Sequence, residues 1–514
     1  MKPILSYPLA ALVALVTGCA TLPPSKDRLE TVVLTDTAGT RLGRAIAPAV
    51  AANPGKTAIH ALPGPRDAFA ARVLLAGAAE KSLDAQYFIW NGDHVGYLLF
   101  QALWQAAERG VRVRLLLDDL NTKGLDSTIA VLDAHPNIEV RLYNPVVIRD
   151  NRMLNFATDF TRVNRRMHNK SFTVDNQATV VGGRNIADEY FGAGAGLTFA
   201  DLDVLAVGPA VPEVSKEFDA YWNSASAYPA SGFVGPPTPD ATANLEAKFA
   251  ANRADPESIA YLEAVRATPV VRELMDRTLA LEWTVAEVVY DDPAKTLDTT
   301  ERTDVLLFPE LMRKMGRPEK MLDIVSPYFV PGDGGAALLA ALAKRGVTVR
   351  ILTNSLAASD EKSVHSGYAK RRRDLLQAGV RLYEIKPTVT KEKGESSSRF
   401  GSGSSSGLHA KTLAVDSRRI FVGSFNFDQR SARLNTEMGL VLSNPVLAQR
   451  LTRFFDVEVP MLAYEVRLTG EGNSLEWIER TASGEKHYDT EPATDLSTRM
   501  GVELLSILPI EWLL

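Results

Sequence analysis

Apolar and polar residues show their clearest pattern in the first quarter of the chain. Ser82–Trp90 alternates with the two-residue period of a strand. Val95–Arg109 carries apolar residues at helical spacing and stops at Gly110, as helices commonly do. Val111–Leu117 is almost wholly apolar, which predicts a buried strand. This order of strand, helix and strand predicts a crossover unit with parallel pairing, and hence an α/β fold.

The same order of elements returns in the second half of the chain. Leu322–Val330 matches the first strand, and the helix and the next strand recur at Ala336–Lys344 and Val347–Leu352. The tetrapeptide Val-Arg-Leu-Tyr also occurs twice, at residues 140–143 and 380–383. Internal repeats of this kind indicate a duplicated unit. We therefore predict two similar α/β halves related by a pseudo-twofold axis, with the functional site between them.

Composition indicates where these halves begin and end. Residues 20–56 are rich in Thr, Pro, Ala and Gly with little periodicity, so we expect ordered structure to begin near Thr57. Residues 224–245 have the Pro, Ala, Ser and Gly content of a connector. The predicted divisions are a signal peptide, a lipid-anchored tether, an N-terminal half, a connector with a helical segment, a C-terminal half and a C-terminal appendage, at residues 1–18, 19–56, 57–223, 224–300, 301–463 and 464–514.

Two segments of the second half invite separate interpretations. Lys391–Gly407 consists largely of Ser, Gly and charged residues, which cannot supply a core. It is either a disordered surface loop or a mobile loop at the entrance of the site, and we favour the second because it leads into a catalytic motif. The apolar tail Val502–Leu514 is expected to pack against the body rather than enter a membrane. Three short strands before this tail are expected to make the appendage antiparallel.

The first residues have the pattern of an export signal. Met1-Lys2 is followed by an apolar run, Ile4–Val16, which is shorter than the about 20 residues of a spanning helix. The next residues, Thr17-Gly18-Cys19, complete a sequence that resembles a bacterial lipobox, which implies cleavage before Cys19 and its acylation. The alternative is an ordinary signal peptide with an incidental cysteine. Because no Asp follows Cys19, the resemblance implies the periplasmic side of the outer membrane.

Charge and cysteine content exclude some classes of protein. The 514 residues include 57 basic and 62 acidic side chains, a net charge of −5, so nothing global indicates a polyanion-binding protein. We therefore expect no nucleic-acid partner, and any phosphate recognition should be local. A single cysteine in an exported chain leaves no internal disulfide.

One short pattern, found twice, carries the strongest chemical signal. It reads His-x-Lys, four residues, Asp, six residues, then Gly-Gly or Gly-Ser, one residue and Asn, and the two histidines lie 241 positions apart. Two matches with the same internal spacing are not a chance event. The repeated residues are His168, Lys170, Asp175 and Asn185 in the first copy and His409, Lys411, Asp416 and Asn426 in the second.

Two histidines and two lysines that converge across an axis suit a phosphodiester. One imidazole can attack phosphorus to give a covalent phospho-histidine, and the other can protonate the leaving alkoxide and then deprotonate the incoming hydroxyl. The lysines and asparagines can stabilise the non-bridging oxygens. No metal or other cofactor is required, and no cluster has metal-ligand spacing. On regular strands Asp175 and Asp416 point away from the histidines, so we expect them to bond turn backbone or a buried partner.

Other residues are expected to complete the site. Each histidine needs an orienting carboxylate, and we choose Asp201 and Glu437, with Asp203 as the alternative to Asp201. Gly183 and Ser424, in the turns that close the two motifs, are assigned to substrate binding. A basic run precedes the first motif, and it is either a solvated face or a site mouth that contacts anionic headgroups. Its members are Arg149, Arg152, Arg162, Arg165 and Arg166, of which Arg166 is assigned to substrate binding.

The duplicated motif resembles that of the phospholipase D superfamily, over most of residues 57–510. The resemblance implies that His168 and His409 are the catalytic pair, and we choose His168 as the nucleophile. Several stretches also resemble bacterial cardiolipin synthases of the C type. They are Arg165–Asn176, Gly182–Ile186, Asp201–Pro209, Leu352–Ala357 and Gly423–Asn426.

These observations lead to a ranked set of functions. The first is a phosphatidyltransferase that forms cardiolipin by transfer to phosphatidylglycerol, with either phosphatidylglycerol or phosphatidylethanolamine as donor. The second uses water as acceptor and is a phospholipase D that releases phosphatidic acid. Another phosphodiesterase or a nuclease ranks below these, since the chain lacks an excess of basic charge. A lipid-binding lipoprotein without activity would not need both histidines. Phospholipids and a membrane surface are the expected partners.

Overall fold

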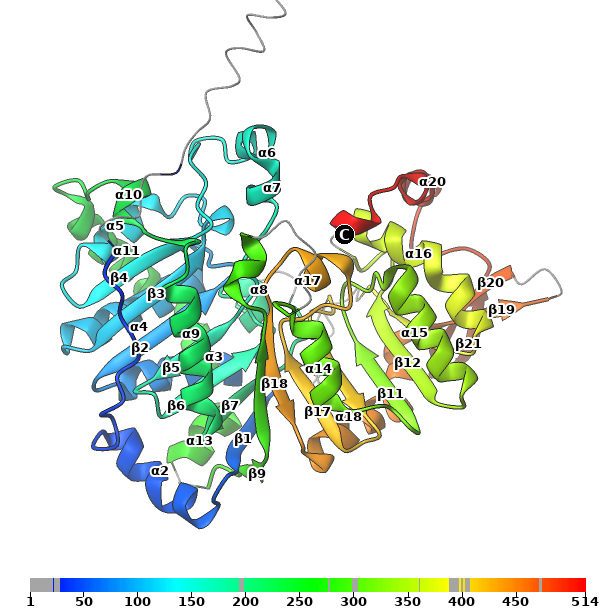
Figure 1. Ribbon diagram of the computed structural model, residues 1–514, viewed down its shortest axis with the longest axis horizontal. Coiled ribbons are helices and arrows are strands. Elements are labelled where there is room, and N and C mark those ends of the chain that lie inside the picture. Colours follow the sequence, from blue (N-terminus) through cyan, green and yellow to red (C-terminus); the bar gives the residue numbers. More distant parts are fainter. Residues whose placement is uncertain are drawn as a thin grey trace, which may run out of the picture.

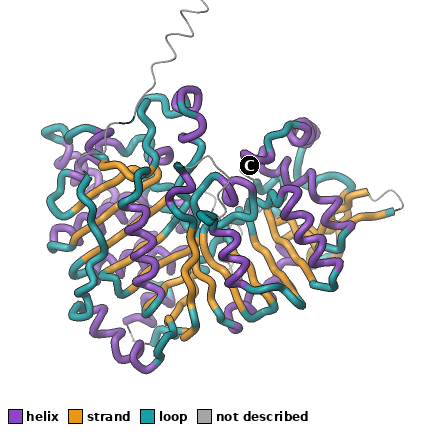
Figure 2. Tube along the Cα trace, in the orientation of Figure 1, coloured by secondary structure: helices purple, strands orange, loops and turns teal. Residues whose placement is uncertain are grey.

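The computed structural model describes residues 22, 28–193, 198–275, 278–297, 304–359, 361–387, 397–398, 401–402, 407–470 and 474–514. Two mixed sheets lie side by side, one in each half of the chain (Figure 1). The strands of both sheets are flanked by helices (Figure 2). The predicted duplicated α/β fold is confirmed.

The first sheet has the strand order β8-β4-β3-β2-β5-β6-β7-β1-β9. Its strands β2, β3 and β4 are parallel, and the strands on either side of these three pair antiparallel. The bounds are β1 (Thr57–Leu62), β2 (Ser82–Tyr87), β3 (Arg112–Asp118), β4 (Ile138–Tyr143), β5 (Ser171–Val174), β6 (Ala178–Gly182), β7 (Asp203–Val207), β8 (Ala227–Pro229) and β9 (Glu282–Thr284).

The second sheet has the order β10-β18-β17-β16-β11-β12-β13-β19-β20-β21, again with three parallel strands, β11, β12 and β13, inside antiparallel ones. Its bounds are β10 (Ala286–Tyr290), β11 (Met321–Val325), β12 (Thr348–Asn354), β13 (Arg381–Ile385), β16 (Thr412–Val415), β17 (Arg419–Gly423), β18 (Met438–Leu442), β19 (Ala463–Thr469), β20 (Ser474–Thr481) and β21 (Gly484–Tyr488). A separate pair joins β14 (Ser397–Ser398) and β15 (Gly401–Ser402).

Helices connect the parallel strands of each sheet. In the N-terminal half they are α2 (Arg41–Ala52), α3 (Pro65–Ala78), α4 (His94–Glu108), α5 (Asp126–Asp133), α6 (Leu154–Thr158), α7 (Phe160–Val163), α8 (Asp188–Phe191), α9 (Ala210–Trp222), α10 (Ser231–Val234), α11 (Ala241–Ala254), α12 (Pro256–Arg266) and α13 (Pro269–Met275). In the C-terminal half they are α14 (Leu307–Met315), α15 (Gly332–Lys344), α16 (Lys362–Gln377), α17 (Gln429–Arg433), α18 (Pro445–Val457), α19 (Val459–Leu462) and α20 (Leu496–Ile507). Short 3-10 turns are η1 (Asp119–Asn121), η2 (Pro293–Thr296) and η3 (Glu511–Leu513).

Helix α4 shows how local sequence sets these bounds. Its N-cap, Asp93, accepts a hydrogen bond from the backbone N–H of Gly96 at 2.9 Å. Gly110 follows its end with φ of 89°, a left-handed conformation that glycine adopts without a Cβ clash. The predicted helix Val95–Arg109 is therefore shifted by one residue only.

Each half has its own hydrophobic core, and a further core lies between the two halves. One cluster of buried residues lies under the helices of the N-terminal sheet and a second within the C-terminal half. A third cluster joins β6 and β7 to β17 and β18, and includes Val181, Val204, Ile420 and Leu440. Burial of apolar side chains from both halves in one cluster fixes the two sheets against each other.

Several predicted boundaries differ from the structure. Helix α2 and the hydrogen bonds of Arg28 to the carbonyls of Asn223 and Ala227 lie before Thr57, so ordered structure begins earlier than expected. The connector supplies edge strands to both sheets, β8 and β9 to the first and β10 to the second. The three predicted strands of the appendage form as antiparallel strands, but β19 pairs with β13, so they extend the second sheet.

Some predictions fall outside the described residues. The signal peptide and Cys19 do so entirely, and the predicted loop Lys391–Gly407 does so almost entirely. The apolar tail is described, and its expected packing against the body is seen for part of its length. The tail packs against the body through Val502 and Leu514, but Leu504 and Ile507 are exposed.

Candidate active site

The two motif segments lie at equivalent places in the two sheets. His168 and Lys170 immediately precede β5, and His409 and Lys411 immediately precede β16. In the register, Ser171 lies beside Gln86 near the carboxyl end of β2. Thr412 likewise lies beside Val325 at the carboxyl end of β11. Both histidines therefore lie at the edge where the parallel strands end, which is the usual binding edge of such sheets.

The aspartates of the motifs lie at the opposite ends of these hairpins. Asp175 has φ of 51°, and its carboxylate accepts the backbone N–H groups of Glu80, Lys81 and Ser82 at 2.7 to 3.3 Å. Asp416 makes the same contacts with residues 319–321. The turns thus anchor the starts of β2 and β11. This geometry supports the structural role argued from strand parity, so the two residues are not part of the catalytic group.

Each motif pairs with backbone from the other half. The His168 N–H donates to the Thr436 carbonyl at 2.8 Å, and the Thr436 N–H donates to the Arg166 carbonyl. The His409 N–H donates to the Ala200 carbonyl, also at 2.8 Å. Thr436 and Ala200 each precede one of the candidate carboxylates. The backbone pairing therefore brings the carboxylate of one half beside the histidine of the other.

The side chains make this exchange explicit. His168 Nδ1 lies 2.8 Å from Glu437 Oε2, and His409 Nδ1 lies 2.6 Å from Asp201 Oδ2. All four side chains are buried or nearly so. A carboxylate that accepts the Nδ1 proton fixes the tautomer and leaves Nε2 available for chemistry. Asp203, the alternative carboxylate, instead pairs with Arg72 at 3.0 Å.

The turns that close the motifs support these carboxylates. The Ser424 hydroxyl donates to Glu437, and the Ser431 hydroxyl donates to its other oxygen at 2.7 Å. A Cβ placed on Gly183 would lie 2.2 Å from Asp201 Oδ1. Ser424 and Gly183 therefore position carboxylates, which corrects their assignment to substrate binding.

The lysines and asparagines surround the histidines unequally. Lys170 Nζ donates to the His168 carbonyl at 2.5 Å, and Lys411 Nζ lies 2.9 Å from His409 Nδ1. Asn185 is held by the Ile89 N–H and by the Tyr190 hydroxyl. Asn426 Oδ1 is buried without a hydrogen-bond partner among the described residues. Asn426 thus has unused capacity that the protein itself does not satisfy.

Burial dominates the titration of the histidines. Burial, with the charges of Lys170 and Lys411, holds the pKa of His168 well below its usual range. Burial and the charge of Lys411 lower the pKa of His409 to about 3, although Asp201 acts in the opposite direction. Each imidazole feels the lysines of both halves, so the two motifs share one electrostatic environment.

The two carboxylates titrate differently. Burial raises the pKa of Glu437 to about 7. Burial would also raise the pKa of Asp201, but His409, Lys411 and Arg184 outweigh it and hold that pKa at about 2. The pair in which a carboxylate is firmly ionised is therefore His409 with Asp201.

The basic run before the first motif does not form an open mouth. Arg166 pairs with Asp118 at 2.9 Å and donates to the carbonyls of residues 143, 144 and 163. Arg149 pairs with Asp119 and Asp126. These partners occupy the guanidinium groups, so the assignment of Arg166 to substrate binding is wrong and its role is structural.

Sequence reasoning missed the polar groups that surround the backbone of the first motif. Asn169, the middle residue of the first motif, donates to Glu217 at 2.6 Å and accepts from the Thr436 hydroxyl at 2.9 Å. Gln86 also donates to Glu217. The second motif has Ala410 at the equivalent position, so this network belongs to one half only. One sequence signal was available. The first motif has Asn169 where the second has Ala410, which indicates that this amide is not needed for the shared chemistry.

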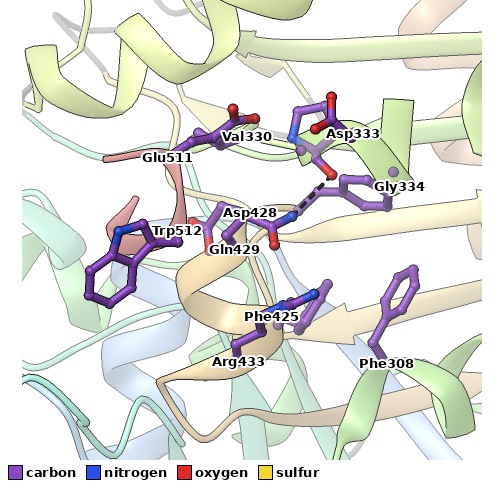
Figure 3. Close-up of a pocket in the computed structure, with 15 residues that line it drawn as sticks. Phe308, Val330, Asp333, Gly334, Phe425, Asp428, Gln429, Arg433, Glu511 and Trp512 are labelled. Carbon is purple, nitrogen blue, oxygen red and sulfur yellow. Dashed lines mark hydrogen bonds between the residues drawn. The ribbon is translucent and has the colours of Figure 1, made fainter. Parts of the chain in front are cut away.

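A cavity of about 520 Å³ lies beside the second motif (Figure 3). Phe308, Phe425 and Phe427 line it together with Trp512 near the C-terminus, and Gln429 donates to the Pro331 carbonyl across it. Neither the catalytic histidines nor the lysines contribute to its wall. The cavity therefore lies next to the second motif, and its wall includes Phe425 and Phe427 on either side of Asn426.

The described part of the chain contains neither a membrane-spanning helix nor a cluster of metal ligands. None of the described helices has both the length and the apolar content needed to cross a bilayer. Within the same residues, His, Cys, Asp and Glu side chains do not gather in groups of three or more that could hold a metal ion.

Comparisons with known proteins show similarity over most of the chain. The family profile described as "Cardiolipin synthase, PLD-like domain" matches residues 74–222 and 311–458. The chain is 46% identical to cardiolipin synthase C of Escherichia coli (strain K12), over 92% of this chain and 100% of the relative. It is 25% identical to the major cardiolipin synthase ClsA of Bacillus subtilis (strain 168), over 76% of this chain and 66% of that one.

A solved structure shares the fold. The crystal structure of phosphatidylserine synthase from Haemophilus influenzae Rd KW20 aligns with a TM-score of 0.54 and 13% sequence identity. The alignment covers 92% of this chain and 99% of the other. At that identity the similarity concerns the fold alone.

Proposed function

Because this chain belongs to the family of phospholipase D-like cardiolipin synthases, a family of phospholipid phosphatidyltransferases, we propose that it forms cardiolipin through a covalent phospho-histidine. The proposed acceptor is the headgroup hydroxyl of phosphatidylglycerol. The observation that carries the mechanism is the exchange of carboxylates between halves, which gives each of two buried histidines its own partner in a single site.

In the first step, Nε2 of neutral His168 attacks the phosphorus of the donor lipid. The bond from phosphorus to the headgroup oxygen breaks, and His409 gives its Nε2 proton to the departing alkoxide. The products are phosphatidyl-His168 and the free headgroup alcohol, which is glycerol when phosphatidylglycerol is the donor. A phosphodiester anion beside the imidazoles would raise the pKa of His409, so the acid can carry its proton with substrate bound.

In the second step, neutral His409 removes the proton of the phosphatidylglycerol hydroxyl. The resulting oxygen attacks phosphorus, the phosphorus–nitrogen bond to His168 breaks, and cardiolipin leaves. His409 ends the cycle protonated, as it began. The lysines and Asn426 hold the non-bridging oxygens while phosphorus is pentacoordinate.

The choice of roles rests on the two carboxylates. Asp201, with its pKa of about 2, stays ionised beside His409 and stabilises the imidazolium that an acid must form. Glu437, with its pKa raised to about 7, is a weaker anion and favours neutral His168, the form that attacks phosphorus.

The test uses purified protein, labelled phosphatidylglycerol and rapid quenching. We expect labelled cardiolipin and glycerol, with a phosphatidyl adduct on His168 by mass spectrometry. His168→Ala should show neither adduct nor product, and His409→Ala should lower turnover at least 10²-fold. His487→Ala, at an exposed histidine of β21, is the matched control and should behave as the parent protein.

Two results would overturn parts of the proposal. An adduct on His409 in place of His168 would reverse the roles of the two residues. Phosphatidic acid without cardiolipin would identify water as the acceptor and the protein as a phospholipase D. Detection of the adduct tests the first step, and product analysis tests the second. The choice of nucleophile and the choice of acceptor can therefore be disproved independently.

For localisation, we propose that Cys19 is acylated and holds the protein on the periplasmic side of the outer membrane. The support is the sequence before Cys19, since this residue lies outside the described part of the chain. Metabolic labelling with a fatty acid should mark the parent protein and spare Cys19→Ser. Labelling of both, or recovery of the parent in inner-membrane fractions, would contradict the anchor or its destination.

A further inference from the structure

Two projecting segments expose an unusual share of the protein's apolar side chains. Of the nineteen large hydrophobic residues that are exposed in the described part of the chain, nine lie in residues 153–160 and 496–512. We call these nine residues the apolar rim. They are Met153, Leu154, Phe160, Leu496, Met500, Leu504, Ile507, Leu508 and Trp512.

Helix α20 carries four of the nine rim residues, all on one face. Leu496, Met500, Leu504 and Ile507 lie within an arc of about 80° at 100° per residue. Val502, which packs toward the body and is 5% exposed, lies on the opposite side of the helix. Ile507 is 76% exposed. The helix thus turns its smaller apolar side inward and its larger apolar stripe outward, the reverse of an ordinary surface helix.

The rim lies on the same edge of the molecule as the catalytic group. Helices α6 and α7 follow the carboxyl end of β4, the edge at which His168 lies. Figure 1 shows α6, α7 and α20 projecting on the same side of the two sheets. The two parts of the rim are also tied together, because Arg430 donates to the carbonyls of Asn164, after α7, and Leu513, near the C-terminus. Arg430 itself lies between Asn426 and Glu437 of the site.

We propose that the apolar rim inserts into the surface of the phospholipid bilayer from which the catalytic site takes its substrate. This inference rests on the proposed function, because a phospholipid substrate has its acyl chains in a bilayer and its phosphate at the surface. The rim projects from the body on separate short helices, which suits a broad fluid surface. The exposed stripe of α20 is apolar and is bordered by the exposed Glu503, an anion that anionic lipid does not attract, so insertion depends on apolar contact more than on anionic lipid.

Local labels can test insertion without interference from an anchor elsewhere. Cys19 is the single cysteine, so Cys19→Ser gives a cysteine-free full chain. Leu504→Cys and Phe160→Cys place an environment-sensitive fluorophore on the two parts of the rim. Val446→Cys is the control, because Val446 is 52% exposed and follows β18, which runs from the catalytic edge to the opposite one.

The probe membranes are vesicles of phosphatidylethanolamine and phosphatidylglycerol that contain a quencher-labelled lipid. We expect a blue shift and several-fold quenching at positions 504 and 160, none at 446, and little change in 1 M salt. No response at 504 and 160, or an equal response at 446, would overturn the proposal. A blue shift that grows with protein concentration in the absence of lipid would identify a second copy of the chain as the occupant and would also overturn it.

An activity measurement separates this inference from the proposed function. The double variant Leu504→Gln with Ile507→Gln should lose at least tenfold activity on vesicles and retain activity on lipid dispersed in detergent micelles. Equal loss on both would contradict a role at the membrane. His168→Ala should still insert. If the parent protein inserts but makes no cardiolipin on vesicles or in micelles, the proposed function is wrong. Insertion of the apolar rim would still be supported.

Discussion

At the scale of single residues, the two halves use different side chains to place a carboxylate beside each histidine. Asp201 is short, and its carboxylate lies 2.2 Å from where a Cβ of Gly183 would be. Glu437 is longer, and its oxygens are held by the hydroxyls of Ser424 and Ser431. The glycine of the first motif and the serine of the second therefore match the lengths of the carboxylates that they face.

This match predicts the effect of Gly183→Ala. The added methyl group must displace Asp201, so His409 loses its orienting partner and kcat should fall by about 10²–10⁴-fold. KM should change much less, because Lys170 and Lys411, which we propose to hold the phosphate, are untouched. Steady-state kinetics would measure both constants.

Gly77→Ala is the matched control for this substitution. A Cβ on Gly77 meets nothing within 4 Å, and the residue lies inside helix α3. We expect unchanged turnover and a gain in stability of up to about 1 kcal/mol. A Gly183→Ala protein with near-normal kcat would show that Asp201 does not orient His409.

Glu217 gives a prediction about pH. Burial raises its pKa to about 8, so it is neutral at pH 7 between Asn169 and Gln86. A carboxyl group whose pKa is raised by folding stabilises the native state at low pH, and that contribution is lost as pH rises toward the folded pKa. Because Glu217 ionises in the unfolded chain while it stays neutral in the native protein, the free energy of unfolding should fall between about pH 4.5 and pH 8.

Glu217→Gln removes this titration and keeps a neutral side chain of the same shape. Gln86 Oε1 is buried without a partner, so that amide can turn to accept from the new Gln. Relative to the parent, the variant should gain about 1 kcal/mol in unfolding free energy between pH 7 and pH 9. Urea unfolding at both pH values measures it, and a constant difference would contradict a neutral Glu217.

At the scale of elements, the added strands of the second sheet are fixed by a buried ionic group. Arg372 of α16 pairs with Glu384 of β13 at 3.2 Å and with Glu491 at 2.5 Å. Trp477 of β20 donates to Glu384 at 2.8 Å. One guanidinium thus joins a crossover helix, a parallel strand and the antiparallel extension.

Removal of this cation should be costly because it leaves buried carboxylates unpaired. Arg372→Ala is expected to destabilise the protein by about 3–5 kcal/mol. Arg381→Ala, at an exposed arginine of β13, should change stability by less than about 0.5 kcal/mol. Urea unfolding followed by Trp fluorescence would compare them, and equal effects would show that the ionic group does not stabilise the extension.

At the scale of the whole molecule, the halves are interlocked. β10 precedes residues 298–303 but pairs with β18, which follows them. Lys295 donates to the Ser431 carbonyl, and Asp291 accepts the Glu437 N–H, each at 2.8 Å. The N-terminal part of the chain thus supplies both a strand and direct support for the catalytic carboxylate of the C-terminal part.

Cleavage within residues 298–303, where the connector meets the C-terminal half, should therefore leave the protein assembled. With a protease site inserted within residues 298–303, we expect both fragments to co-elute in gel filtration and to retain most of the activity. Apolar burial in the core shared by the two sheets stabilises the association of the fragments. Uncleaved protein with the same insertion is the control, and fragments that separate under native conditions would contradict the interlocked arrangement.

The sequence by itself determined the duplication and the principal elements. Repeats of pattern and motif report local properties, namely strand and helix periodicity and the residue types that phosphodiester chemistry requires. The pairs His168 with Lys170 and His409 with Lys411 could be read directly from the repeated motif. Strand parity also predicted a structural role for Asp175, but the structure gives that role to the turn after β5, where Asp175 has φ of 51°.

Tertiary structure alone decided which partner each residue has. His168 meets Glu437 across 269 positions, and Arg166 turns to Asp118 instead of the substrate. Such contacts depend on how two sheets pack, and sequence spacing carries no record of that packing. The outward stripe of α20 could not be predicted for the same reason. An apolar pattern predicts that a helix forms, but it does not say which face of the helix packs against the body.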